Sequence, residues 1–420
     1  MKFFLCLLCQ LSIQAQELSP PLAKETFLHV WNKVNAPFYE ENSEGLDWDS
    51  IKSTYETRVE KAKSGKELRL ILNEMLGELK LSHFGVSKNP NEPEQDKNAT
   101  TGDYLGLELR LHENQIVIFE VVQNSPAERA GLKPGMILTS YEGEALSEII
   151  ADLELTPKST PLHRLTSIRS ILNKLSSPSD GKTTLKIADS NKVFDFEPGF
   201  YQGEKGMMFG NQTPIPFFFE SRLVGEEQNI RLLTFDIFLI ELMPRINQAI
   251  AQAYNENEAG LVIDLRGNPG GIGLMASGVI GRLIDKELDL GDMINANGNI
   301  PFHAFPQKEA YLGPVAVLVD SFSASTSEIF AAALQEHQRA RLFGRPTTGA
   351  VLPSFIEELP NGDRFQYAIG NYITDLHKAQ LEGKGVTPDQ VIPLNPTSLL
   401  AGGDPDLEAA ILWLEKQSSQ

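Results

Sequence analysis

The stretch GPVAVLVDSFSASTSEIFAAALQEHQ (313–338) contains the strand-to-helix junction around which the fold is built. Residues 315–319 are apolar and mostly β-branched, which predicts a buried strand, and a helix is expected over 325–337. Three serines fall at the helix start, where free backbone N–H groups and the positive end of the helix dipole converge. Ser325 to Glu328 also has the S-x-x-E spacing of a capping box, so a purely structural role for this junction stays open.

Two further strand-to-helix junctions precede this one. NIRLLTFDIF (229–238) leads into a helix at 240–256, and GLVIDLRGNPGGIG (260–273) leads into a helix near 273–285. Repeated apolar strands followed by helices predict an α/β domain with a largely parallel or mixed sheet over 205–420. The glycines of the second junction free backbone N–H groups for a phosphate or an oxyanion, or simply form a tight turn.

The preceding half of the chain has a different character. Residues 16–98 show helical patterns until the polar stretch 87–103, which is typical of a linker or surface loop. Residues 100–196 contain short β-branched runs separated by turns, with a helix inserted at about 159–176. The sequence therefore predicts a helical N-terminal region, a small β-rich domain and an α/β core.

The first fifteen residues have the pattern of a secretory signal peptide, because a cation is followed by an apolar run that ends in small Ala15. Residues 1–15 are therefore expected to be removed, which places the protein outside the cell or in a periplasm. Cys6 and Cys9 are the only cysteines, so the mature chain would have no cysteine nucleophile and no cysteine-based zinc site. No later segment is apolar enough to predict a membrane span.

Composition and histidine placement exclude other classes. With 37 basic and 56 acidic residues the net charge is −19, which argues against a nucleic-acid partner. No histidine pair has helical ligand spacing, so neither a metal nor any other cofactor is expected. His83 lies in the short segment 81–85, between apolar residues and near a glycine, where it is either a base for a serine nucleophile or a half-buried structural histidine.

Taken in order, several motifs resemble those of the tail-specific (C-terminal processing) serine peptidases and their tricorn-type relatives. The motifs are Ser82-His83, YLGL (104–107), SPAERAGLKPGMIL (125–138), FDIF (235–238), VIDLRGNPGG (262–271), SASTSEIFAAALQEHQRA (323–340), GRPTTGAVLPS (344–354) and EGKGVTPD (382–389). This resemblance implies a multidomain α+β protein with a crotonase-like α/β serine-protease core at 205–420. It also implies a PDZ-like domain at 100–196, inserted after the N-terminal helical region at 16–98.

The resemblance also implies roles for individual residues. Ser325 would be the nucleophile, and the N–H of Thr326 with that of Gly270 or Gly271 would form the oxyanion hole. In the PDZ-like domain, the free N–H groups of Leu105, Gly106 and Leu107 would capture the C-terminal carboxylate of a peptide, or the domain would only cover or support the core.

One position departs from the tail-specific pattern. Where that family has a general-base lysine, this chain has Ala350, and an alanine cannot take a proton. The tricorn-type relatives use a Ser-His-Ser-Glu constellation instead, which implies His83 as general base, with Ser82 and Glu382 orienting it. Lys384 is the only nearby lysine that could substitute, and it is interpreted as a surface charge.

These observations predict a secreted serine endopeptidase that acts on proteins or peptides, with the PDZ-like domain recruiting C-termini. An alternative is a catalytically inactive protein that binds peptides or other ligands on the same fold. The loss of lysine at position 350 favours that alternative. The sequence does not indicate an oligomeric state.

Overall fold

The computed structural model describes residues 18–34, 46–88, 103–152, 161–175, 183–188, 193–197, 199–200, 204–206, 215–295 and 298–418. None of the helices in these ranges combines the length and the apolar character needed to span a bilayer. The predicted signal peptide lies outside the described residues. The chain forms two compact units: Met1–Lys80, Phe84–Gln95 and Phe355–Tyr367 make up unit 1, and Leu81–His83, Asp96–Ser354 and Ala368–Gln420 make up unit 2.

Unit 1 contains three helices that contact one another, α1 (Pro20–Val34), α3 (Trp48–Val59) and α4 (Gly65–Gly77). They occupy the segments in which apolar residues recur every three or four positions, as the sequence predicted. Asp47 caps α3, because its side chain accepts a 3.0 Å hydrogen bond from the N–H of Ser50. Each helix buries one apolar face, with Phe27, Leu72 and Met75 fully buried.

A small sheet of unit 1 combines segments from both ends of the sequence. Its strand order is β1 (Gly85–Ser87), β20 (Arg364–Ala368), β19 (Ser354–Glu358). Glu357 of β19 accepts a 2.8 Å hydrogen bond from Lys33 of α1, and Asp363 pairs with Arg69 of α4 at 2.8 Å. The hairpin 355–367 therefore groups with the N-terminal helices, although its sequence position lies within the range predicted for the core.

One part of unit 2 is rich in β-strands and is here called the insert domain (residues 103–200). Its sheet has the order β3 (Leu107–His112), β4 (Gln115–Val121), β5 (Ile137–Tyr141), β7 (Thr183–Ile187), β8 (Val193–Phe196), with β6 (Glu144–Ala145) paired to β5. It also contains β2 (Asp103–Tyr104), which pairs with β9 (Gly199–Phe200), and the helices α5 (Pro126–Ala130), α6 (Leu146–Asp152) and α7 (Pro161–Leu175). The predicted short strands and the inserted helix are confirmed, and α5 ends at Gly131, which adopts a left-handed conformation.

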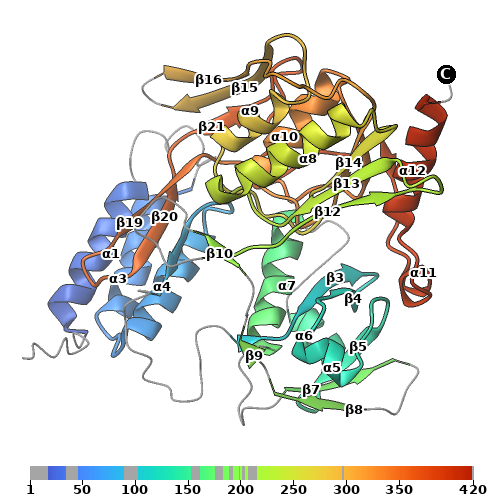
Figure 1. Ribbon diagram of the computed structural model, residues 1–420. Coiled ribbons are helices and arrows are strands. Elements are labelled where there is room, and N and C mark those ends of the chain that lie inside the picture. The colour runs from blue at the N-terminus through green and yellow to red at the C-terminus, as the bar shows by residue number, and fades with distance from the viewer. Residues whose placement is uncertain are drawn as a thin grey trace, which may run out of the picture. The chain divides into compact units, whose positions relative to one another are not determined.

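The rest of unit 2, here called the core domain, is built on one mixed sheet (Figure 1). Its strand order is β12 (Phe219–Val224), β13 (Ile230–Phe235), β14 (Gly260–Asp264), β17 (Val315–Val319), β18 (Arg341–Gly344), β22 (Gln390–Val391). The β12–β13 pair is antiparallel and the other pairs are parallel. The predicted α/β class is therefore confirmed.

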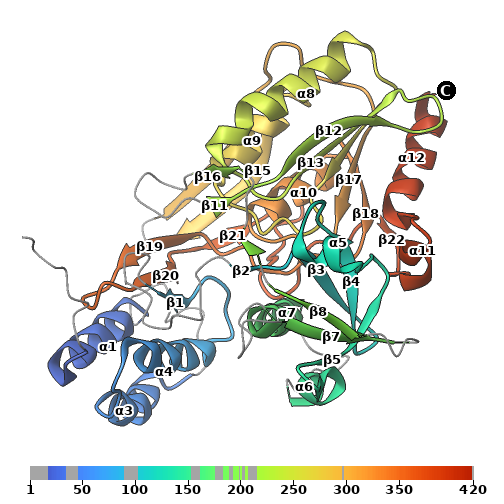
Figure 2. The same ribbon diagram turned by 60° about the horizontal axis from the view of Figure 1, so that its bottom comes forward.

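Helices cover both faces of this sheet, as the turned view shows (Figure 2). Helices α8 (Met243–Asn255), α9 (Leu274–Ile280) and α10 (Thr326–Glu336) pack on one face, where Leu233, Ile263 and Val317 point. Helix α12 (Pro405–Ser418) packs on the other face, against Leu232, Val262 and Leu318. Because both faces are covered, the central strands are apolar at nearly every position rather than at alternate ones.

The sequence did not predict a second small sheet of the core domain, with the order β16 (Gly298–Ala304), β15 (Leu288–Asn295), β21 (Asn371–Ile373). The remaining elements of the core domain are short: β10 (Lys205–Gly206), β11 (Ile215–Pro216), η1 (Ile240–Leu242) and α11 (Pro396–Leu400). Helix α9 is shorter than predicted and ends at Ile280. The following residue, Gly281, has no room for a side chain, because a Cβ atom there would lie 2.4 Å from the carbonyl oxygen of Phe305.

Candidate active site

Ser325 lies at the carboxyl edge of the core sheet, in the tight turn that connects β17 to α10. It is the N-cap of α10, and its φ of 55° lies in the left-handed region that non-glycine residues rarely adopt. Its neighbours in the run 322–330 are buried, whereas Ser325 itself is half-buried. The turn therefore presents this one side chain at the surface of an otherwise buried segment, and strain of this kind often accompanies function.

Glu328 holds the turn in place. This fully buried carboxylate accepts hydrogen bonds from the N–H of Ser325 at 3.0 Å, which confirms the predicted capping box. It also accepts from Thr347 Oγ1 at 2.5 Å, Gly349 N at 2.7 Å and Ala350 N at 2.8 Å. Burial raises the pKa of Glu328 to about 7, although these hydrogen bonds oppose the rise. One side chain thus ties the loop 347–350 to the start of α10.

The glycine turn that follows β14 lies directly against Ser325. A Cβ atom on Gly270 would come within 2.7 Å of Ser325 Cβ and 2.8 Å of the Thr326 nitrogen. Thr326 Oγ1 donates to the carbonyl of Gly271 at 3.0 Å, so the two segments are also joined by a hydrogen bond. Close approach is possible only because Gly270 carries no side chain and adopts a φ of 97°.

The backbone N–H groups of Gly270, Gly271 and Thr326 differ in whether they already have a hydrogen-bond acceptor. The N–H of Gly270 donates to Asn268 Oδ1 at 2.9 Å. In contrast, the N–H groups of Gly271 and Thr326 donate to no acceptor within the described part of the chain. Thr326 is the first residue of α10, and Gly271 is joined to it by the hydrogen bond from Thr326 Oγ1. Backbone donors at a helix N-terminus can stabilise a negatively charged oxygen.

Ser82, His83 and Glu382 form one hydrogen-bonded group, although 300 residues separate Ser82 from Glu382. Glu382 accepts from Ser82 N at 2.7 Å and from Ser82 Oγ at 2.9 Å. Ser82 Oγ also lies 2.7 Å from His83 Nδ1. Because a hydroxyl has one proton and Ser82 gives it to the carboxylate, the bond to His83 requires a protonated Nδ1. The network therefore assigns the tautomer in which Nε2 is a free acceptor.

The environment of His83 keeps the imidazole neutral. Burial lowers its pKa from 6.5 to about 4, and the positive charge of Arg169 on α7 contributes. Burial also raises the pKa of Glu382, while the hydrogen bonds that this carboxylate accepts oppose the rise. At neutral pH the imidazole is thus in the form that can accept a proton.

The serine turn and the Ser82–His83–Glu382 group are both hydrogen-bonded to neighbouring residues of one loop. Ala350 O accepts the N–H of Ser325 at 2.8 Å, and the next residue, Val351, donates its N–H to Glu382 Oε2 at 3.0 Å. Ala350, at the position of the absent lysine, is buried, whereas Lys384 is exposed. The backbone at 350–351 therefore connects the serine turn with the histidine group.

The predicted peptide-binding residues lie elsewhere in unit 2, at the start of β3. Leu105 and Leu107 are buried in the apolar cluster of the insert domain. Gly106 has a φ of 76°, and a Cβ atom there would lie 2.0 Å from Ser125 Cβ. β3 is the edge strand of its sheet, which is the position to which a peptide strand can be added.

Sequence reasoning did not predict the hydrogen-bond partners of two buried carboxylates, Glu328 and Asp320. Glu328 was recognised only as a helix cap, and its bonds to the loop 347–350 were not foreseen. Asp320 was not singled out, although an acidic residue directly after the buried strand 315–319 is an unusual feature in itself.

Comparisons with known proteins bear on the same segments. Residues 230–392 match the model of Peptidase family S41, and residues 23–77 match that of the Tricorn protease C1 domain. The chain is 25% identical to a carboxyl-terminal-processing protease of Synechocystis sp., over 88% of this chain and 81% of that protein. It is 26% identical to a probable CtpA-like serine protease of Staphylococcus haemolyticus, over 79% of this chain and 61% of that protein.

Solved structures share the fold. The photosystem II D1 C-terminal processing protease aligns with a TM-score of 0.59 at 19% identity, over 93% of this chain and 97% of that one. Mature CPAF complexed with lactacystin aligns with a TM-score of 0.66 at 15% identity, over 95% of this chain and 98% of that one. At these identities the likeness concerns the fold alone.

Proposed function

We propose that this chain hydrolyses peptide bonds through an acyl-enzyme on Ser325 with His83 as general base. The proposal proceeds from the premise that the chain is a serine-type peptidase, since residues 230–392 match the model of Peptidase family S41. The observation that carries this proposal is the Ser82–His83–Glu382 network, which leaves His83 Nε2 as a free acceptor. A serine nucleophile needs such a base, and general-base catalysis contributes roughly 10²–10⁴ in rate.

In the proposed reaction, Ser325 Oγ attacks the carbonyl carbon of the scissile bond while its proton moves to His83 Nε2. The carbonyl oxygen becomes an oxyanion, which the N–H groups of Thr326 and Gly271 stabilise. When the intermediate collapses, His83 gives the proton to the leaving amine and the peptide bond breaks. Water then attacks the ester on Ser325 with His83 again as base, which releases the new C-terminus.

Gly271 is a better donor than Gly270 for this hole. The Gly270 amide already donates to Asn268 Oδ1, so its role is to let the glycine turn approach Ser325 closely. Ser82 and Glu382 act on the base rather than on the substrate, because they hold its tautomer and ring orientation.

Lys384 is a poor alternative base. Its side chain is exposed, whereas a general base has to be held beside the proton that it removes. The neutral imidazole of His83 is held by the hydroxyl of Ser82. These features favour histidine over lysine catalysis in this chain.

For substrate capture, we propose that the insert domain is PDZ-like and that the core domain has a crotonase-like fold. The free edge of β3, which begins at Leu107 directly after Leu105 and Gly106, would receive the C-terminal strand of a protein substrate. Relatives named as carboxyl-terminal-processing proteases support this substrate class. The signal-like residues 1–15 support secretion or a periplasmic location.

Active-site labelling tests the nucleophile. A fluorophosphonate probe should attach to Ser325 in the wild type, and peptide mapping by mass spectrometry identifies the modified residue. Ser325→Ala should abolish both labelling and peptide hydrolysis. A folded wild-type protein that hydrolyses peptides but carries the label at another residue would contradict the proposal.

A further inference from the structure

Asp320 occupies a fully buried position at the end of β17, on the strand-to-helix turn that ends at Ser325. Its Oδ1 accepts the N–H of Gly267 at 3.0 Å and the N–H of Phe322 at 2.9 Å. Its own N–H donates to Ser323 Oγ at 3.0 Å, and that hydroxyl donates to Leu265 O at 2.7 Å. One side chain with its local partners therefore joins the end of β14 to the end of β17.

These two strand ends carry the two halves of the proposed oxyanion hole. The segment that starts at Gly267 runs on to Gly271, and the segment that follows Asp320 runs on to Ser325 and Thr326. The distance between the amides of Gly271 and Thr326 thus depends on how firmly the two segments are held together. A misplacement of about 1 Å at a reacting centre can reduce the rate by about 10²-fold.

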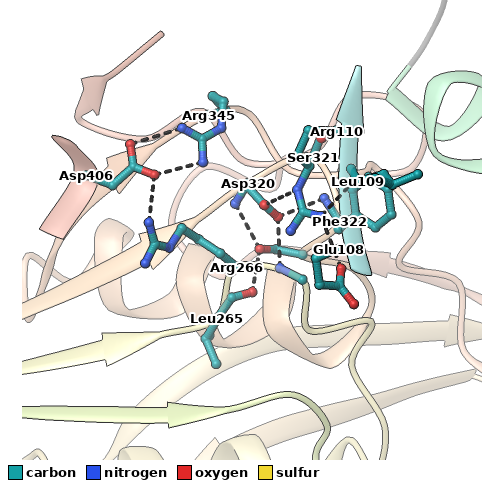
Figure 3. Close-up of polar contacts among 12 residues, drawn as sticks. Glu108, Leu109, Arg110, Leu265, Arg266, Asp320, Ser321, Phe322, Arg345 and Asp406 are labelled. Carbon is teal, nitrogen blue, oxygen red and sulfur yellow. Dashed lines mark hydrogen bonds and ion pairs between the residues drawn. The ribbon is translucent and has the colours of Figure 1, made fainter. Parts of the chain in front are cut away.

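The partner of Asp320 comes from the insert domain (Figure 3). Arg110 of β3 donates from Nε to Asp320 Oδ2 at 2.6 Å, and both side chains are buried. The guanidinium carbon lies 4.2 Å from the ring centre of Phe322 and 4.5 Å from that of Phe119. Phe322 itself belongs to the apolar cluster of the insert domain.

The charge of Arg110 matters for the carboxylate. Burial alone would raise the pKa of Asp320, but Arg110, with help from Arg345, holds it below the ordinary value. Asp320 therefore stays ionised and can accept from Gly267 and Phe322 together. A carboxylate accepts more strongly than a neutral group, because charge-assisted hydrogen bonds are the stronger kind.

We propose that Asp320 and Arg110 are positioning residues, which fix the glycine turn and the serine turn relative to each other and so set the geometry of the oxyanion hole. The insert domain contributes to the active site through this pair, in addition to any role in substrate capture. The inference rests on the proposed function, because it concerns the hole beside Ser325.

The structure offers a matched control in the same cluster. Arg345 also pairs with a buried aspartate, Asp406, at 2.8 Å and also faces the ring of Phe119. Its side chain hydrogen bonds go to Asp406 and to the carbonyl of Ile392. Arg110→Lys and Arg345→Lys therefore make the same chemical change in comparable surroundings, and only the first replaces a side chain that hydrogen-bonds to Asp320.

The experiment is steady-state peptide hydrolysis by the full chain, with affinity for a peptide boronate as second readout. We expect Arg110→Lys and Asp320→Asn to lower kcat by about 10²-fold while KM changes by less than about twofold. Affinity for the boronate, which mimics the tetrahedral intermediate, should fall in parallel with kcat/KM. Arg345→Lys should leave kcat and boronate affinity unchanged.

A wild-type kcat in folded Arg110→Lys would overturn the inference, as would an equal loss of kcat in Arg345→Lys. A rise of KM at constant kcat in Arg110→Lys would also overturn it, because that pattern indicates lost substrate binding. If Asp320→Asn does not fold, Arg110→Lys decides the question. Failure of the proposed function can be told apart from failure of this inference, because Ser325→Ala would retain hydrolysis only if the proposed function were wrong.

Discussion

At the scale of single residues, the protonation of His83 makes the site testable by pH. Because burial lowers its pKa to about 4, the imidazole stays neutral and competent as a base throughout the range above that value. We therefore expect the protonation of His83 to leave kcat/KM unchanged between pH 5 and 7 and to lower kcat/KM as the pH drops through about 4. Arg169→Gln should move this acid limb to higher pH, because it removes a charge that disfavours the imidazolium. An acid limb that Arg169→Gln leaves in place would show that another group controls it.

Gly270 gives a second prediction at this scale. Gly270→Ala adds a methyl group that would lie 2.7 Å from Ser325 Cβ, so we expect kcat to fall by about 10²-fold. Gly143→Ala is the matched control, because its φ of 82° is similarly left-handed but no atom lies within 4 Å of the added Cβ. That control should lose about 1–2 kcal/mol of stability from backbone strain and keep its kcat. Equal kcat in the two variants would contradict the close approach.

At the scale of elements, Glu328 links helix α10 to the loop 347–350. Glu328→Gln replaces one accepting oxygen with an NH₂ group that faces backbone donors, which leaves buried groups unpaired. We expect the free energy of unfolding to fall by about 1–3 kcal/mol in urea titrations. Glu148→Gln changes the same atoms on an exposed part of α6 and should have little effect. A Glu328→Gln protein as stable as the wild type would mean that the loop is held by other contacts.

Element identity was largely predictable, whereas the partners of some elements were not. Periodic apolar residues predicted α1, α4 and α10, and unbroken apolar runs predicted β14 and β17, because local spacing reports burial. The hairpin of β19 and β20 was missed, since its pairing with β1 depends on a segment far away in the sequence.

At the scale of the whole molecule, the insert domain and the core domain share side chains. Phe322 follows a core strand but is buried in the insert domain cluster. Phe322→Ala should reduce stability by about 3–5 kcal/mol and increase hydrogen exchange in β3, β4 and the serine turn together. Phe305→Ala removes a side chain that is 60% exposed and should leave exchange unchanged. Faster exchange confined to the serine turn would contradict the shared packing.

The sequence predicted the residues of the candidate site but not all of their partners. Ser82, His83, Glu382, Ser325 and Thr326 were placed by motif resemblance, and the structure brings them into two groups that meet at residues 350–351. The contacts of Asp320 with Arg110 and of Glu328 with Gly349 were not predictable. Both join buried charges to segments distant in sequence, and no local pattern encodes such a partner.

The choice of base is the central claim, and hydrolysis of one peptide substrate by two variants tests it most directly. We expect His83→Ala to lower kcat/KM by roughly 10²–10⁴-fold. The kcat/KM of Lys384→Ala, which changes an exposed side chain, should remain within about twofold of the wild-type value. The opposite result, with full activity in His83→Ala and none in Lys384→Ala, would contradict histidine catalysis.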